Sequence, residues 1–250
     1  MKSIDFNCFV GGWPFHKVRN NQFQDIQRIH RENGIDYGYI SSTNGIFYND
    51  PYEAAVDLYH EIKASDYKQV MVVNPDLPGC EDDIHRAVKD LQIAGIRILP
   101  GFHGYSLQDD CVKKLCALLK QYQLPLFLTL RMEDERVTYL FHPKSVPMEE
   151  VRDFISTNKD LKILLCNIRM DEVFNIKDHI LDHSNLMFDT SGLKDGLFPL
   201  ERLKAQGLLN HLVYGSLAPI YCLKSTMLLV TEDDITKQEQ EDICSGRSFL

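Results

Sequence analysis

The sequence has no excess of basic residues and no long apolar run. Its 27 lysines and arginines are outnumbered by 36 aspartates and glutamates, so the formal net charge is −9. An acidic chain repels phosphate backbones and anionic lipids, and we therefore expect no nucleic acid and no membrane as partner. No stretch approaches the roughly 20 apolar residues that cross a bilayer. A small anionic molecule stays possible, because a local basic cleft can lie on an acidic body.

Cysteines are few and are not arranged in pairs. The chain has seven, an odd number, and no two of them have C-x-x-C spacing. This excludes a disulfide framework and a zinc-finger pattern. The amino-terminal segment carries Asp5 and Asn7 where a signal peptide needs apolar residues. We therefore expect a reducing compartment, the cytoplasm.

Glycine-rich nucleotide-binding motifs are also missing, which counts against an open, doubly wound sheet. Instead, eight short apolar runs alternate with longer amphipathic segments. The runs are 3–10, 37–42, 69–74, 95–99, 126–131, 162–168, 186–190 and 212–215. Nearly continuous apolar runs are typical of parallel strands that are buried on both faces. Eight such units in 250 residues predict a single α/β domain, a (β/α)8 TIM barrel that spans residues 1–250.

Local signals between the runs predict helices. Apolar residues recur at helical spacing over 23–29. Asp50 and Pro51 form a typical helix start, with a capping side chain followed by proline in the first turn. Thr236 and Glu239 have the spacing of a capping box and predict the start of the last helix.

Six segments, in chain order, resemble motifs of the amidohydrolase superfamily, in particular its decarboxylase-like and uronate-isomerase-like branch. They are 4–9 (followed by Gly11 and 14–15), 95–100, 125–129, 162–167, 185–192 and 214–219. Each motif is weak by itself, but the ordered set covers essentially the whole chain. The resemblance implies a TIM barrel whose active site lies at the carboxyl ends of the strands, and a divalent metal that activates water.

The sequence departs from this family at the positions that match its metal ligands. These positions hold Asn7, Phe9, Thr129, Asn167 and Leu217. Phenylalanine and leucine have no lone pair to donate, and amide oxygens are poor zinc ligands. We therefore expect no cofactor and no metal. We also expect Cys8 and Cys166 to face the helices as packing residues, and His30 to be a surface or capping residue.

Arginines follow or lie within several of the predicted strands. Arg97, Arg131 and Arg169 are expected to face the barrel axis or its rim, and Arg136 follows on a loop. Because guanidinium groups bind carboxylate or phosphate through two parallel hydrogen bonds, the arginines predict a site for a small anion. An alternative is that they pair with Asp5, Asp134 and Asp189 and simply fill the barrel.

His103 and Asp189 are the candidate catalytic residues. Glycines flank the segment around His103, and histidine titrates near neutral pH. Asp189 is expected to be an inward carboxylate that serves as base or only as a hydrogen-bond acceptor. The other candidate substrate-binding residues are Asn7, Tyr105 and Asn167.

These residues leave two functional hypotheses. The first is an amidohydrolase-like hydrolase that acts on a small carboxylated or phosphorylated compound. The second is a barrel that binds a ligand or a partner without catalysis. A homodimer is possible on general grounds alone.

Overall fold

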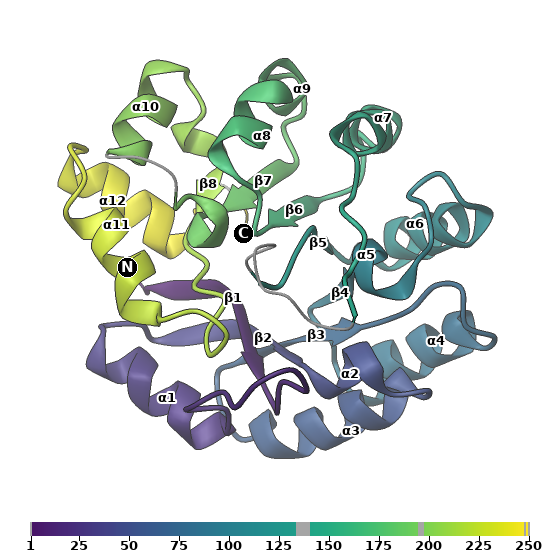
Figure 1. Ribbon diagram of the computed structural model, residues 1–250. Coiled ribbons are helices and arrows are strands. Elements are labelled where there is room, and N and C mark those ends of the chain that lie inside the picture. Colours follow the sequence, from purple (N-terminus) through teal and green to yellow (C-terminus); the bar gives the residue numbers. More distant parts are fainter. Residues whose placement is uncertain (1, 134–140, 195–197, 248, 250) are drawn as a thin grey trace.

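The computed structural model describes residues 2–133, 141–194, 198–247 and 249. Eight parallel strands follow one another around a barrel in chain order, and the helices pack outside them (Figure 1). The strands are β1 (Ile4–Val10), β2 (Tyr37–Ser42), β3 (Lys68–Val72), β4 (Gly95–Ile98), β5 (Leu126–Thr129), β6 (Ile163–Cys166), β7 (Leu186–Asp189) and β8 (Leu212–Val213). This confirms the predicted (β/α)8 fold.

Two helices begin where the capping signals at Asp50 and Thr236 predict. The Asp50 side chain accepts a hydrogen bond from Tyr52 N, and Thr236 and Glu239 form the expected reciprocal capping box. The helices are α1 (Phe23–Glu32), α2 (Asn44–Phe47), α3 (Pro51–Ile62), α4 (Cys80–Asp90), α5 (Pro100–His103), α6 (Asp110–Tyr122), α7 (Met148–Thr157), α8 (Met170–Asn175), α9 (Lys177–Leu181), α10 (Pro199–Ala205), α11 (Leu223–Thr231) and α12 (Lys237–Ser245). None of the helices in the described part of the chain has the length and apolarity to cross a membrane.

The segment after β8 completes the barrel against β1. Phe6 N donates to Tyr214 O at 2.9 Å, and Phe9 N donates to Ala218 O at 2.7 Å. These backbone bonds hold residues 214–218 beside the first strand. The carboxyl end of the barrel, where the predicted site lies, is therefore closed around its circumference.

β1 contains an irregularity that changes which side chains share a face. Its pairing with β2 matches Asp5 to Gly38 and Cys8 to Ile40, so β1 has one residue more than its neighbour over this stretch. Residues three apart in a regular strand point to opposite faces, whereas an extra residue brings them to the same one. Asp5 and Cys8 consequently both face α1.

Two apolar clusters fill the barrel interior. The floor cluster lies toward the amino ends of the strands and consists of Ile4, Phe6, Tyr39, Val70, Phe127, Leu164, Cys166, Met187, Val213 and Phe249. The mouth cluster lies toward the carboxyl ends and consists of Phe9, Trp13, Ile46, Val72, Leu99, Met132 and Leu217. The polar groups described next lie between these two clusters.

Candidate functional site

The guanidinium group of Arg97, from the middle of β4, is the centre of the polar layer. Its Nε donates to Ser41 Oγ at 2.9 Å, and its Nη1 donates to Asn7 Oδ1 and to Thr129 Oγ1, each at 2.8 Å. The side chain is completely buried. Arg97 therefore points into the barrel, as the sequence predicts, and connects strands β1, β2, β4 and β5.

Two features distinguish this arginine from a fully satisfied structural residue. Its Cζ lies 4.4 Å from the centre of the Phe9 ring and 5.5 Å from that of Phe127, so it is stacked between aromatic side chains. Its Nη2 has no hydrogen-bond partner among the residues that the structure describes. Burial lowers the pKa of Arg97. An open donor on a buried cation is a place where an anionic or polar ligand atom gains a strong hydrogen bond.

Asp189, the last residue of β7, is the buried carboxylate of the same layer. Its Oδ1 accepts hydrogen bonds from Asn167 N at 3.0 Å, Ser191 N at 3.1 Å and Ser191 Oγ at 2.8 Å, and its Oδ2 accepts one from Asn7 Nδ2 at 2.5 Å. Burial raises the pKa of Asp189 to about 6, although these hydrogen bonds oppose the rise. Such a carboxyl can hold or release a proton near neutral pH.

The Asn7 side chain joins the cation to the carboxylate. Its Oδ1 accepts from Arg97, and its Nδ2 donates to Asp189. We call Arg97, Asn7 and Asp189 the central network. The amide thus links the two opposite charges, while Arg97 Nη2 has no hydrogen-bond partner among the described residues.

Gly215 packs directly against the central network. A Cβ at this position would lie 2.7 Å from Asp189 Oδ2 and 2.9 Å from Asn7 Cβ, whereas at Gly12 it would meet nothing within 4 Å. We expect Gly215→Ala to cost roughly 1–3 kcal/mol of unfolding free energy, as overpacking usually does. Gly12→Ala should stay within about 0.5 kcal/mol. Urea denaturation of both variants measures this, and equal effects would contradict the close packing at residue 215.

Above the network, aromatic side chains gather around Trp13. Its ring lies 5.5 Å from Phe15, 5.4 Å from Phe47 and 5.8 Å from Phe102, each in an edge-to-face arrangement. Trp13 is only 5% exposed, and its Nε1 has no hydrogen-bond partner in the described part of the chain. Buried indole N–H groups usually have a partner, so this is a second open donor at the mouth.

Arg131 contacts a carboxylate of α8 and not the central network. Arg131 donates from Nη1 to Asn167 O and to Glu172 Oε2, each at 2.8 Å, and from Nη2 to Glu172 Oε1. Its charge is therefore matched by a carboxylate. Arg169 is half-buried and precedes α8, where its backbone N also donates to Glu172. Arg136 lies outside the described residues.

His103 and Tyr105 follow β4, and their ring centroids lie 6.1 Å apart. His103 ends α5, and its Nε2 donates to Ile46 O at 3.0 Å, which leaves Nδ1 without a partner among the described residues. Burial lowers the pKa of His103, so the imidazole is neutral and can accept a proton at Nδ1. Tyr105 packs in the apolar layer between strands and helices, away from the barrel interior.

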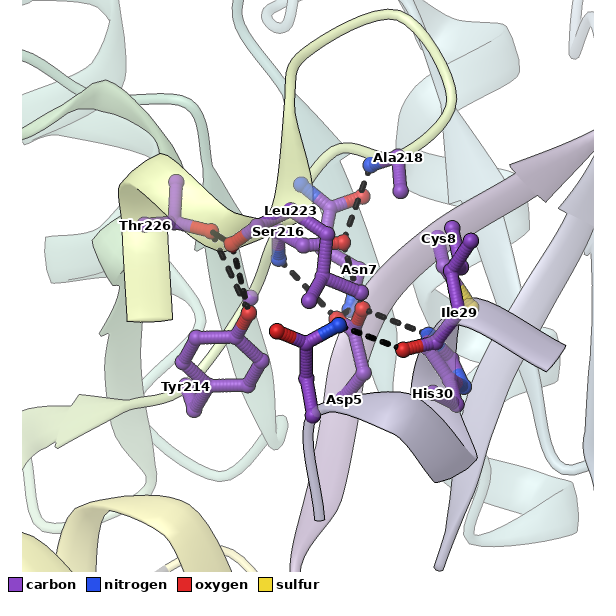
Figure 2. Close-up of polar contacts among 12 residues, drawn as sticks. Asp5, Asn7, Cys8, Ile29, His30, Tyr214, Ser216, Ala218, Leu223 and Thr226 are labelled. Carbon is purple, nitrogen blue, oxygen red and sulfur yellow. Dashed lines mark hydrogen bonds and ion pairs between the residues drawn. The ribbon is translucent and has the colours of Figure 1, made fainter. Parts of the chain in front are cut away.

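A second buried polar cluster was not predicted from the sequence. Asp5 Oδ2 accepts from His30 Nε2 at 3.1 Å, and Asp5 Oδ1 accepts from Ser216 N at 3.0 Å (Figure 2). The Ser216 hydroxyl also donates to Asp5. His30 Nδ1 lies 2.8 Å from Tyr67 OH. The expectation of a surface or capping role for His30 is therefore wrong, because its side chain is 1% exposed.

A signal for this cluster does exist in the sequence. His30 follows Phe23 and Ile26 at helical spacing, and all three are the buried residues of α1. A histidine on the apolar face of a helix, opposite an aspartate in an otherwise apolar strand, predicts a buried pair.

Cys166 corrects another expectation. Its side chain belongs to the floor cluster inside the barrel, whereas Cys8 packs outside the strands as predicted. The reason lies in the next residue, since Asn167 has a φ of +58°. This left-handed turn breaks the strand alternation on which the prediction relied. Asn167 Nδ2 accordingly donates to Arg131 O at 2.9 Å.

Known proteins resemble this chain in structure only. No family model and no curated protein sequence matches it. A candidate amidohydrolase from Staphylococcus aureus superposes with a TM-score of 0.72 at 13% identity, and the match covers 98% of this chain and 97% of that one. A 5-carboxyvanillate decarboxylase from Sphingomonas paucimobilis gives 0.73 at 12% identity, over 99% and 98% of the two chains. A dihydroxybenzoic acid decarboxylase from Polaromonas gives 0.73 at 13% identity, over 99% and 96%.

These findings overturn the expectation that no metal is involved. The Polaromonas enzyme was crystallised with bound manganese and the inhibitor 2-nitroresorcinol. In the present chain, Asp5, Cys8 and His30 each offer one potential ligand atom, and these atoms lie within 4.8 Å of one another. A prediction of metal-free chemistry from five substituted positions was therefore wrong, because those positions do not decide whether another part of the chain holds an ion.

The five matched positions themselves do not fit a divalent ion. Phe9 and Leu217 are buried in the mouth cluster and have no donor atoms. The oxygens of Asn7 and Thr129 both accept hydrogen bonds from the Arg97 guanidinium, which would repel a metal ion placed between them. We derive no reaction step through a metal at these positions.

The structural similarity thus covers nearly the full length of this chain and of the compared proteins. At 12–13% sequence identity it shows a shared fold and not a shared chemistry. It agrees with the order of the sequence motifs from the first strand to the eighth. The chain therefore has the fold of the amidohydrolase-type TIM barrels.

Proposed function

We propose that the protein is an enzyme of the hydrolase or decarboxylase type that acts on a small carboxylated compound at the barrel mouth. The observation that carries this proposal is the open Nη2 of the fully buried Arg97, linked through Asn7 to a carboxyl whose pKa is raised to about 6. A cation that binds an anion and a group that transfers a proton are the minimum for such chemistry. The decarboxylases of the same fold support the substrate class.

Charge and surroundings favour a carboxylate over a phosphate as the bound anion. Among the residues that the structure describes, the open donors at the mouth are Arg97 Nη2 and Trp13 Nε1, which are few for the oxygens of a doubly charged phosphate. The surrounding side chains are apolar and aromatic, among them Phe9 and Leu217. A ring or short hydrocarbon with one carboxylate matches this combination, since its apolar part replaces contacts within the mouth cluster.

Each candidate residue then has one role. Arg97 binds the substrate carboxylate through Nη2, and Asn7 holds the guanidinium and Asp189 in place. Asp189 holds or releases a proton, and the neutral His103 is the alternative proton acceptor at Nδ1. Asn167 fixes the Asp189 carboxylate through its backbone N–H. The Arg131 guanidinium positions Asn167 by donating to the Asn167 backbone oxygen. Tyr105 packs away from the barrel interior and has no role in this proposal.

Binding and turnover of a compound panel test the proposal. Purified protein is mixed with benzoate, hydroxybenzoates, phthalates and phenyl phosphate, and thermal stabilisation and product formation are followed, the latter by mass spectrometry. We expect carboxylates to raise Tm and at least one to be converted. Trp13→Phe, which removes the indole N–H donor together with part of the ring, should weaken binding at least roughly tenfold, as loss of one hydrogen bond of about 1.5 kcal/mol does.

The control for this experiment is the exposed Arg28→Met, which should bind like the unmodified protein. Conversion that is unchanged in both Trp13→Phe and His103→Ala would contradict the assigned site. Binding without any conversion would instead favour the second function, a ligand-binding barrel. The apolar residues Phe9 and Leu217, at the positions that match the family's metal ligands and base, support this alternative.

A further inference from the structure

We propose that Asp5, Cys8 and His30 form a site for a zinc-type transition-metal ion between β1 and α1. The site is independent of the proposed function and lies outside the barrel interior. Its three side chains are completely or almost completely buried, at 0%, 0% and 1% exposure. A carboxylate oxygen, a thiol sulfur and an imidazole nitrogen are the ligand types that zinc and cobalt(II) prefer.

The β1 irregularity brings the three ligands together. In a regular strand Asp5 and Cys8 would point to opposite faces, but the extra residue in β1 turns both toward α1, where His30 is located. All three ligand atoms lie within 4.8 Å of one another. Bonds of 2.0–2.3 Å to a tetrahedral ion place ligand atoms roughly 3.3–3.8 Å apart. The observed cluster therefore needs only small side-chain movements to close around an ion.

The strand next to the cluster leaves room for it only because residue 38 is a glycine. A Cβ on Gly38 would lie 2.8 Å from Cys8 Sγ and 3.1 Å from His30 Cε1. This close approach has no role in the barrel interior. It places the thiol and the imidazole against the backbone of β2 and fixes the direction of both donors.

Hydrogen-bonding groups around the three candidate ligands hold these side chains in place, as the outer hydrogen-bond partners of known metal sites do. His30 Nδ1, the nitrogen opposite Nε2, is within hydrogen-bond distance of Tyr67 OH at 2.8 Å. Asp5 Oδ1 accepts from the backbone N–H groups of Asn7 and Ser216, each at 3.0 Å (Figure 2). Asp5 Oδ2 accepts from the Ser216 hydroxyl and from His30 Nε2, and an ion would take the place of the His30 proton between these two atoms. Such outer contacts hold ligand rings and carboxylates in place in known sites.

Charge balance supports a doubly charged ion. Binding converts the Cys8 thiol to a thiolate, with its proton released to solvent, while His30 contributes a neutral nitrogen. Two anionic ligands and one divalent cation leave no net charge in a fully buried place, which avoids the cost of an unpaired buried ion. The three protein ligands leave a fourth tetrahedral position for a water molecule.

Cobalt(II) binding to the full chain tests the site. Protein stripped with a chelator is titrated with cobalt(II), and thiolate ligation is read from a sulfur-to-cobalt charge-transfer band in the near ultraviolet. We expect about one cobalt(II) per chain with this band. Cys8→Ser should lose the band, and Cys116→Ser, which changes a buried thiol in α6, should keep it.

A second readout covers the case in which Cys8→Ser does not fold. Zinc should raise the Tm of the unmodified protein as its concentration increases, and His30→Gln should abolish this rise. A folded, unmodified protein that shows no charge-transfer band overturns the proposal, as does a band that persists in Cys8→Ser. Since neither readout uses substrate, failure of this site and failure of the proposed function are distinguishable.

Discussion

Arg97→Met should unfold at a temperature roughly 6–20 °C lower than the unmodified protein, because loss of one partner from a buried charged network costs about 3–5 kcal/mol. The methionine fills much of the same volume but donates no hydrogen bond. Asn7 Oδ1, Thr129 Oγ1 and Ser41 Oγ would each lose the donor that Arg97 now supplies. Differential scanning calorimetry measures the effect, with Arg28→Met as an exposed control that should change Tm little.

A double-mutant cycle separates loss of charge from loss of packing. If Arg97 and Asp189 stabilise each other through Asn7, Arg97→Met combined with Asp189→Asn should be less destabilising than the sum of the single changes. We expect a coupling of about 1–3 kcal/mol, within the range for residues in one network. Strict additivity would show that the two charges do not interact, and that the amide bridge has no energetic role.

Asp189→Asn should also change how stability depends on pH. Because the folded-state pKa of Asp189 is raised to about 6, above the unfolded value of about 3.9, the folded protein keeps this proton while the unfolded chain loses it. The stability that the protonated carboxyl contributes is therefore complete below about pH 4 and is lost as pH rises through 6. The total loss is about 3 kcal/mol, from two pKa units at 1.36 kcal/mol each.

The asparagine variant lacks this titration, so the comparison isolates it. Unfolding free energies of both proteins are measured by urea denaturation between pH 4 and pH 7. The advantage of the unmodified protein over the variant should shrink as pH rises through this window. An advantage that grows with pH would mean that Asp189 is ionised with a lowered pKa, which would remove it as a proton carrier near neutral pH.

The barrel itself could be predicted from the sequence because its signals are local and repeated. Buried parallel strands are nearly continuous apolar runs, and the eight predicted runs contain or closely overlap β1 to β8. Helix starts such as those at Asp50 and Thr236 depend on one side chain and its neighbours. None of these signals needs knowledge of what lies across the barrel.

Parts of the candidate site could be predicted in the same way. Arg97 and Asp189 were correctly expected to point inward, and both lie in regular strands. Their mutual link through Asn7 was not predicted, because it joins side chains 90 and 182 residues apart in the chain. The carboxylate partner of Arg131 is likewise Glu172, on a helix that the strand pattern does not place.

The errors arise where the backbone departs from regular geometry. One extra residue in β1 turns Asp5 and Cys8 to the same side, and the left-handed conformation of Asn167 leaves Cys166 inside the barrel. No glycine or proline lies at either of these two positions, so the sequence gives no local signal of the irregular backbone. The extra residue in β1 explains why Asp5 was not expected on the same side as Cys8, whereas His30 was missed although its helical spacing with Phe23 and Ile26 is regular.

The crystal structure of the protein with a bound aromatic carboxylate from the panel tests the central claim most directly. Our account predicts electron density for the ligand at the barrel mouth, with a carboxylate oxygen within about 3.2 Å of Arg97 Nη2 and the ring among the side chains of the mouth cluster. A carboxylate bound outside the barrel, with Arg97 Nη2 still buried and unpaired beneath an unchanged mouth cluster, would contradict it.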